Sequence, residues 1–155
     1  MYGENASGKS CLGWAIFDIV EHITDNDKDG LPRRNFLNLN SDKEAAKFSY
    51  TFSFHNKDVI YTYKKDESKK LTYESLFING DLIVEYNVGS PINTKLKGTE
   101  SLNKQLKSDS NLSAVKYIHS NSNLHSNSPN NKIFKAFFEY VSNMLFYRVL
   151  IDDLT

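Results

Sequence analysis

Cysteine is almost absent from this 155-residue chain, and Cys11 is the only one. A single cysteine excludes an intramolecular disulfide framework and fits a reducing cytosol. Long apolar runs are also lacking, because no stretch of about 18 consecutive apolar residues occurs. The N-terminus shows no basic-then-apolar signal pattern. We therefore expect a soluble, cytoplasmic protein with no membrane partner.

An excess of charge of either sign is missing as well, because Lys and Arg together number 19 and so do Asp and Glu. A neutral chain has no overall field that would draw it to nucleic acid or to an anionic membrane. A local basic cluster is present at Lys64, Lys65, Lys69 and Lys70, beside Tyr61 and Tyr63. Asp66 and Glu67 dilute this cluster. A charged hairpin loop is therefore preferred over a nucleic-acid site at this position.

The sequence also lacks a convincing metal-ligand pattern. No spacing places two of its histidines on one helical face, and one cysteine does not favour zinc. Acidic residues alternate before a glycine in Asp25–Gly30, as they do at the start of a calcium-binding loop, but the twelfth position is Phe36 instead of glutamate. A solvated loop after a helix is preferred there. Surface or loop positions are expected for His22, His55, His119 and His125.

A phosphate-binding motif is present at the start of the chain. Residues 3–10, GENASGKS, match G-x-x-x-x-G-K-[ST] at every fixed position. The two glycines permit backbone angles that turn consecutive N–H groups inward around an anion. Lys9 would contact the β- and γ-phosphates, and the Ser10 hydroxyl would bind Mg²⁺. The predicted nucleotide contacts are Gly3, Asn5, Ala6, Ser7, Gly8, Lys9, Ser10 and Cys11, with Lys9 also the catalytic candidate.

The motif requires a helix that begins at its lysine, because the free N–H groups of a helix N-terminus favour a bound anion. Apolar residues recur downstream at a spacing of three and four, which predicts a helix from about Lys9 to about His22. Its apolar stripe is Leu12, Ala15, Ile16, Ile19, Val20 and Ile23. A tight turn without a ligand is the alternative interpretation of the glycines. Cys11 is either buried against a sheet or a reactive thiol in the first helical turn, and burial is preferred.

Residues 47–87 predict an antiparallel meander of four strands. Aromatic residues alternate with Ser and Thr over 48–54, which is the two-residue period of a strand with one buried face. Asn79-Gly80 is the dipeptide that tolerates the positive φ angles of a two-residue hairpin turn. An earlier turn is expected at His55–Asp58. The strands are expected at Phe48–Phe54, Val59–Tyr63, Leu71–Ile78 and Leu82–Tyr86.

Residues 110–150 predict helices, whereas residues 88–109 give no assignment. A short helix is expected over Leu112–His119, and the tract His119–Asn123 is interpreted as flexible surface. Asn130 or Asn131 is the expected cap of a last helix that runs through Arg148. The wide aromatic stripe of that helix is interpreted as core.

The loop of the form Y-G-x-N-x-S-G-K-S, the helix after it and the aromatic meander resemble the ABC-like ATPase heads of the chromosome-maintenance and recombination type. The chain is more similar to bacterial AAA-family ATP-binding proteins of abortive phage infection and related defence systems. Three stretches carry this resemblance, and only the first is specific. They are Tyr2–Ser10, Phe48–Tyr86 with its FING sequence, and Ser113–Arg148 with FEYVSNMLFYR.

The resemblance implies an α/β P-loop NTPase domain that is incomplete. Such a domain would have a strand before the phosphate loop, and a longer C-terminal half with a strand ending in Asp-Glu, a signature loop and a switch histidine. Only Met1 and Tyr2 precede Gly3, so we expect an N-terminal part of a larger ATPase head, divided as 1–24, 47–87 and 110–150. ABC-like heads act in pairs, which implies a homodimer, a second ATPase half or an effector protein as partner.

Two further positions are weak candidates for the missing ATPase motifs. Asp152 and Asp153 follow the apolar run Val149–Ile151, as the magnesium-binding acid does in this family, but no linker separates them from the expected helix. An ordinary helix end is preferred. Gln105, the only glutamine, occupies a place where ABC-like heads carry a γ-phosphate sensor, but a polar surface residue is preferred.

The function predicted from the sequence is ATP binding with Mg²⁺ by the N-terminal part of an ABC-like ATPase. Hydrolysis is expected only in the intact or dimeric protein, because the water-activating acid and the signature loop are not visible. The alternative is a non-catalytic remnant or interaction module whose meander presents aromatic side chains to a partner. A small nucleoside-phosphate kinase is disfavoured, because its lid needs arginines and the chain has only three.

Overall fold

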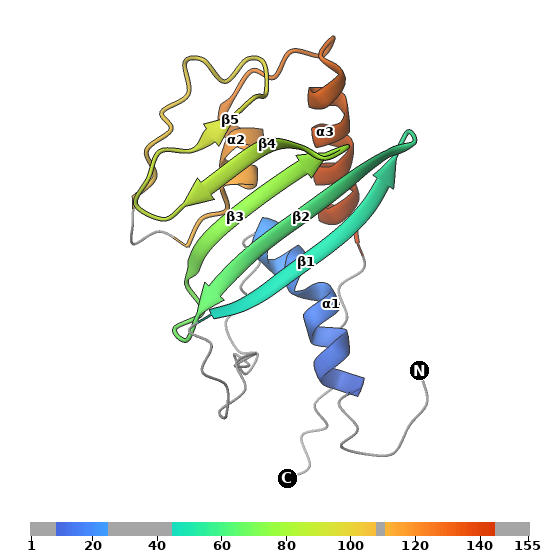
Figure 1. Cartoon of the computed structure of the whole chain (residues 1–155), viewed down its shortest axis with the longest axis vertical. Helices are drawn as coiled ribbons and strands as arrows, with labels where there is room; N and C mark the ends of the chain where they lie inside the picture. Colours follow the sequence, from blue (N-terminus) through green and yellow to red (C-terminus); the bar gives the residue numbers. More distant parts are fainter. Residues whose placement is uncertain (1–8, 25–44, 108–110, 145–155) are drawn as a thin grey trace.

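The computed structural model of the chain describes residues 9–24, 45–107 and 111–144, without the side chains of residues 9–12, 14 and 17. The described part is a mixed α/β fold with a five-stranded antiparallel sheet and three helices (Figure 1). The helices are α1 (Lys9–Thr24), α2 (Ala114–Asn121) and α3 (Pro129–Ser142). The strands are β1 (Ala45–Phe54), β2 (Lys57–Asp66), β3 (Leu71–Ile78), β4 (Asp81–Asn87) and β5 (Asn93–Thr94).

The sheet is a meander in which each strand pairs with the next along the chain, in the order β1-β2-β3-β4-β5. Its turns follow from local residue chemistry. His55 and Asn56 connect β1 to β2 with positive φ angles of 52° and 58°, and Asn79 and Gly80 connect β3 to β4 with 51° and 83°. Because Asn and Gly adopt such angles at low cost, these two-residue turns fix the register of the strands beside them. The four predicted strands and both turns are confirmed.

The three helices lie on one face of the sheet (Figure 1). Strand alternation explains why that face is apolar: in β1 the aromatic residues are buried or half-buried, and the Ser and Thr residues between them are exposed. Phe137 of α3 packs edge-on against Phe52 of β1, with ring centroids 5.5 Å apart, and lies 5.2 Å from the ring of Tyr61 in β2. The largest fully buried side chains are Tyr61, Tyr63, Tyr86, Phe134, Phe137, Ile19, Ile23, Leu76, Ile83, Ile92, Ile118 and Glu74.

Helix α1 confirms the predicted helix and its extent, but Ile16 of its predicted stripe is exposed. Ile19 and Ile23 are fully buried, whereas Ile16 keeps 43% of its surface exposed. The reason is the position of the sheet, which meets the side of α1 that carries Ala15, Asp18 and His22. Periodicity finds an apolar side of a helix, but it does not give the width that a neighbouring sheet covers.

The two C-terminal helices correct three predictions. The short helix is α2, and it includes His119, Ser120 and Asn121, which we interpreted as flexible surface. The last helix is capped at Ser128 with Pro129 in its first turn, because proline needs no N–H partner there. Asn130 and Asn131 therefore lie inside α3, and the described helix ends at Ser142 instead of continuing through Arg148, which is not among the described residues.

Candidate functional site

The phosphate-loop residues divide between the described and the undescribed parts of the chain. Gly3, Asn5, Ala6, Ser7 and Gly8 lie outside the described residues. Lys9, Ser10 and Cys11 form the first turn of α1, and only their backbone is described. The structure therefore places the last three predicted contacts at one end of a 16-residue helix. The sequence predicts the other five contacts, and the structure does not test them.

Hydrogen bonds from the sheet hold α1 along the side that faces β1 and β2. The Tyr50 hydroxyl of β1 donates to the backbone carbonyl of Ala15 over 2.7 Å. One turn further on, the carboxylate of Asp18 accepts from the Tyr63 hydroxyl and from the Lys65 ammonium group, each over 2.6 Å. Asp18 is buried, with 6% of its surface exposed. Because a buried carboxylate is stable only when its lone pairs have donors, these contacts fix the rotation of α1 on the sheet.

His22 extends this contact towards the middle of the sheet. Its ring stacks on Tyr63 with centroids 4.1 Å apart, and its Nε2 lies 3.9 Å from Oε1 of Glu74 in β3. Burial lowers the pKa of His22, and the positive charge of Lys65 lowers it further. The imidazole is therefore neutral at pH 7. We expected a surface or loop histidine here, and that prediction is wrong because His22 lies on the same side of α1 as Asp18.

Glu74 joins the sheet to the start of α2. Its fully buried carboxylate accepts from the hydroxyls of Tyr61 (2.5 Å) and Ser113 (2.7 Å). It also accepts from the first N–H groups of α2, those of Ala114 (2.6 Å) and Val115 (3.3 Å). Burial raises the pKa of Glu74, and the four donors partly offset that effect. A carboxylate at this place satisfies helix N–H groups that have no partner within the helix.

We define the α1 seat as Asp18, His22, Tyr50, Tyr61, Tyr63, Lys65, Glu74 and Ser113. Sequence reasoning missed this cluster as a unit, although one part of it was visible. Asp18 and His22 are four residues apart and interrupt the apolar stripe of the helix. Polar residues on the core-facing side of a helix indicate buried partners. The α1 seat holds α1 in position on the sheet. Its two carboxylates already accept hydrogen bonds from protein donors.

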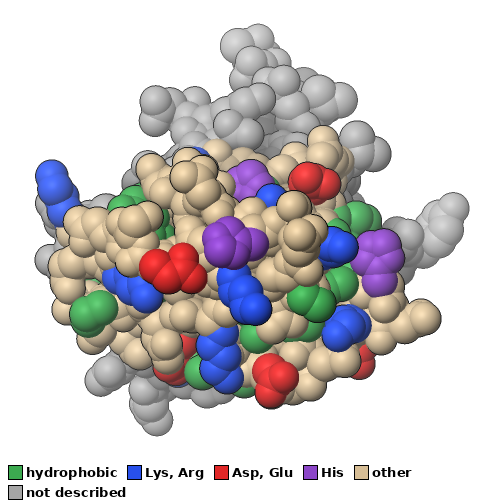
Figure 2. Space-filling view, turned by 90° about the horizontal axis from the view of Figure 1, so that it is seen from above, with side chains coloured by type: hydrophobic (Ala, Val, Ile, Leu, Met, Phe, Trp, Pro, Cys, Tyr) green, Lys and Arg blue, Asp and Glu red, His purple; other side chains and the backbone are tan. Residues whose placement is uncertain are grey.

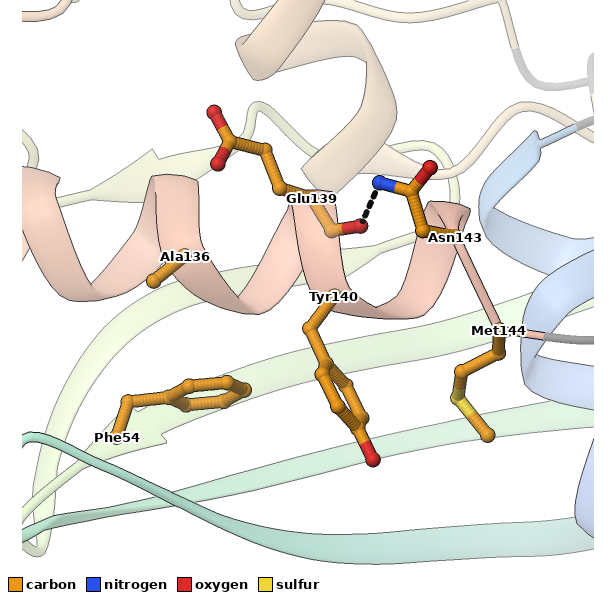
Figure 3. Close-up of a pocket in the computed structure, with 6 residues that line it drawn as sticks. All are labelled: Phe54, Ala136, Glu139, Tyr140, Asn143 and Met144. Atoms are coloured by element: carbon orange, nitrogen blue, oxygen red, sulfur yellow. Dashed lines mark hydrogen bonds between the residues drawn. The ribbon is translucent and has the colours of Figure 1, made fainter.

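A shallow hollow of about 620 Å³ lies where the C-terminal end of α3 meets the end of β1 (Figure 3). The rings of Phe54 and Tyr140 lie on one side of it, and the Asn143 amide donates to the Glu139 carbonyl over 2.7 Å. Its lining is Phe54, Ala136, Glu139, Tyr140, Asn143 and Met144. Since none of these residues is a cation or a buried polar group, the hollow offers nothing that would hold a phosphate.

The remaining candidates from the sequence are not brought together. Gln105 is exposed, and its amide approaches the Gly89 carbonyl at 3.5 Å, as a surface residue would. Lys65 of the predicted basic cluster is half-buried and bound to Asp18, whereas Lys64 and Lys70 are exposed. His119 stacks on Phe138 at 3.7 Å. The calcium-like segment, Phe36, Asp152 and Asp153 lie outside the described residues.

Two absences concern the described residues, and a third concerns the chain as a whole. Among residues 9–24, 45–107 and 111–144, no group of three or more His, Cys, Asp or Glu side chains is placed to hold a metal ion. No helix in this part of the chain is long and apolar enough to cross a membrane. Comparison with protein-family models, curated protein sequences and solved structures gave no match to this chain.

Proposed function

We propose that this chain binds ATP with Mg²⁺ through residues 3–10 and the first turn of α1. The backbone N–H groups of residues 5–10 hold the β-phosphate in this proposal. Lys9 extends to the γ-phosphate as a mobile cation, and the Ser10 hydroxyl is the protein ligand of the magnesium ion. Magnesium takes its other ligands from water and from the phosphate oxygens.

The observation that supports this proposal is the helix that spans Lys9–Thr24. A sequence match to the motif is specific only where a helix starts at its lysine, because the helix N-terminus then adds unpaired N–H groups and a partial positive charge. The α1 seat adds a second argument. Asp18 and His22 anchor the helix to the sheet, so its N-terminus is presented by a fixed element and phosphate binding costs little ordering of the helix.

Two other observations limit the proposal to nucleotide binding, without hydrolysis by this chain alone. The described sheet is antiparallel throughout, whereas the phosphate loop of P-loop proteins follows a strand of their main sheet. Asp18 and Glu74 each have donors on their oxygens, so neither is offered as the acid that polarises the attacking water. We propose that hydrolysis belongs to the intact or dimeric form of an ABC-like ATPase of the phage-defence type, of which this chain is the N-terminal part.

Thermal unfolding with and without nucleotide tests this proposal. ATP with Mg²⁺ at one hundred times its Kd should stabilise the protein by about 3 kcal/mol, because the ligand binds only the folded state. Lys9→Ala should lose most of this gain. Lys57→Ala is the matched control, because Lys57 is also a lysine but lies at the β1–β2 turn. The proposal is wrong if ATP shifts none of the three proteins, or shifts Lys9→Ala as much as the control.

A further inference from the structure

Positive charge is unevenly distributed along this neutral chain. Residues 88–107 and 111–144 contain seven lysines and only two acidic residues, Glu100 and Glu139. Over residues 45–87, by contrast, six lysines are balanced by six acidic residues. The excess therefore belongs to the segments around β5, α2 and α3, and not to the hairpin cluster that the sequence suggested.

Hydrogen bonds gather several of these basic residues at one place. The His125 N–H donates to the Lys97 carbonyl over 3.1 Å. The buried side chain of Asn131 accepts from the Lys97 N–H and donates to the carbonyls of Lys97 and His125. Lys132 follows Asn131 in α3, and the Lys135 ammonium donates to the Leu124 carbonyl over 3.4 Å. We define the basic face as Lys97, Lys104, His125, Lys132 and Lys135.

The loops that carry the basic face are tightly apposed. Gly98 has a φ of +93°, and a Cβ atom there would lie 2.1 Å from the Asn123 carbonyl oxygen. Two acidic residues lie near the basic face. Glu100 lies within electrostatic reach of Lys104 and His125 and accepts a bond from the Gly98 N–H, and Glu139 lies one helical turn from Lys135 in α3. Packed loops therefore hold the basic residues in place, and two carboxylates oppose them, of which Glu100 is bonded to the Gly98 N–H.

Apart from Glu100 and Glu139, the surroundings of the basic face are mostly polar and uncharged. Lys97, His125 and Lys132 are exposed. Exposed uncharged polar side chains near them in sequence include Ser101, Asn103, Asn121, Asn123, Ser126 and Asn127. Of the large hydrophobic side chains that the described residues expose, Ile16 and Ile60 come from other segments, and Tyr140 lies near the C-terminal end of α3, five residues beyond Lys135. Figure 2, which views this end of the molecule, shows Lys and His side chains side by side across the middle of the surface with acidic side chains scattered among them.

We propose that the basic face binds the phosphodiester backbone of a nucleic acid. Phosphate oxygens are contacted mainly by Lys and Arg together with Ser, Asn and Gln side chains, and this is the composition found here. An anionic membrane would require exposed apolar side chains beside the lysines, for insertion at the interface. A protein partner would require a central apolar or aromatic anchor. The exposed residues of the basic face supply neither.

Fluorescence anisotropy with labelled double-stranded DNA, single-stranded DNA and RNA tests the proposal, at several salt concentrations and without ATP. We expect binding to at least one of the three nucleic acids. Comparing their affinities identifies which of them the basic face binds. The affinity should fall as salt rises, because bound lysines release counterions. Lys97→Gln with Lys132→Gln should weaken binding about tenfold and lower the salt slope by about two, since each lysine lost removes one phosphate contact.

Lys47→Gln with Lys64→Gln is the matched control. It removes the same charge from two exposed lysines that face each other across β1 and β2, and it should leave both the affinity and the slope unchanged. Circular dichroism checks that each variant is folded. The proposal is overturned if no nucleic acid binds, if binding does not depend on salt, or if both pairs weaken it equally. Retention on anionic vesicles that requires Lys97 and Lys132 would also overturn it, in favour of a membrane.

Discussion

Asp18, His22 and Glu74 are acidic or basic side chains buried in a core that is mostly apolar and aromatic. Donors from β2 meet Asp18, donors from β2 and the start of α2 meet Glu74, and His22 stacks on Tyr63. A buried carboxylate loses its hydration, and protein donors must replace the lost water. For that reason the two acids of the α1 seat fix the orientation of α1 and α2 more narrowly than apolar contacts would, although they need not add to stability.

His22 should make the stability of the protein depend on pH. Burial lowers the pKa of His22 below its usual 6.5, so the unfolded chain binds the proton more tightly than the folded one. The stability that neutral His22 contributes is fully present above pH 6.5, the pKa in the unfolded chain. It is lost as the pH falls towards the lower pKa of His22 in the folded protein. His22→Phe, which keeps a stacked ring, should remove this dependence.

The measurement is urea unfolding of wild type and His22→Phe between pH 8 and pH 5. Below the unfolded pKa of His22, the free energy of unfolding of wild type should decrease relative to the variant by up to about 1 kcal/mol per pH unit. Wild type is compared with the variant because Glu74 also makes stability depend on pH, in both proteins. Burial raises the pKa of Glu74, so its contribution to the free energy of unfolding changes with pH in the opposite direction to that of His22. Parallel pH profiles would show that His22 is not buried in its neutral form.

Asp18 and Lys65 should be strongly coupled. Asp18→Asn leaves the half-buried ammonium of Lys65 without its anion and should destabilise the protein by about 3 kcal/mol. Lys65→Met leaves the buried carboxylate with the Tyr63 hydroxyl alone and should cost a similar amount. The double variant should lose much less than the sum, because both charges have gone. Additive losses in denaturant unfolding would mean that the pair is not formed in solution.

At the scale of elements, local sequence predicted most of the fold. The strand period of 48–54, the Asn79-Gly80 turn and the apolar stripe of α1 depend on near neighbours, and all three are confirmed in outline. The polar contacts were not predictable in this way. Glu74 binds Tyr61, which is 13 residues away, and Ser113, which is 39 residues away. No periodicity links residues at such separations, so the α1 seat becomes visible only when the sheet is assembled.

The loop that ends at Gly98 tests how closely the segments around β5 and α3 pack. Gly89→Ala and Gly98→Ala both place a methyl group at a positive φ, +87° and +93°, but only the second meets the backbone of Asn123. The conformational cost of about 1 kcal/mol is common to both. Overpacking should add about 2 kcal/mol at Gly98. Thermal unfolding measures the difference, and equal melting temperatures would contradict the close approach of the two loops.

At the scale of the whole molecule, the two proposals use different parts of the chain. Nucleotide binding involves the N-terminal end of α1, and nucleic-acid binding involves the loops and helices beyond β5 (Figure 1). The first was predictable from an eight-residue motif, because every fixed position of the motif is local. The second was not, because the net charge of the chain is zero. Its basic residues come together only through contacts such as those of Asn131.

The central claim is that the amide groups before α1 and the ammonium group of Lys9 bind a triphosphate. Calorimetric titration of ATP with Mg²⁺ into wild type and Lys9→Ala tests it most directly. Wild type should bind with saturation, and Lys9→Ala should bind at least about tenfold more weakly, as expected for the loss of one charge-assisted hydrogen bond. Absence of binding to folded wild type, or equal affinity in both proteins, would contradict the claim.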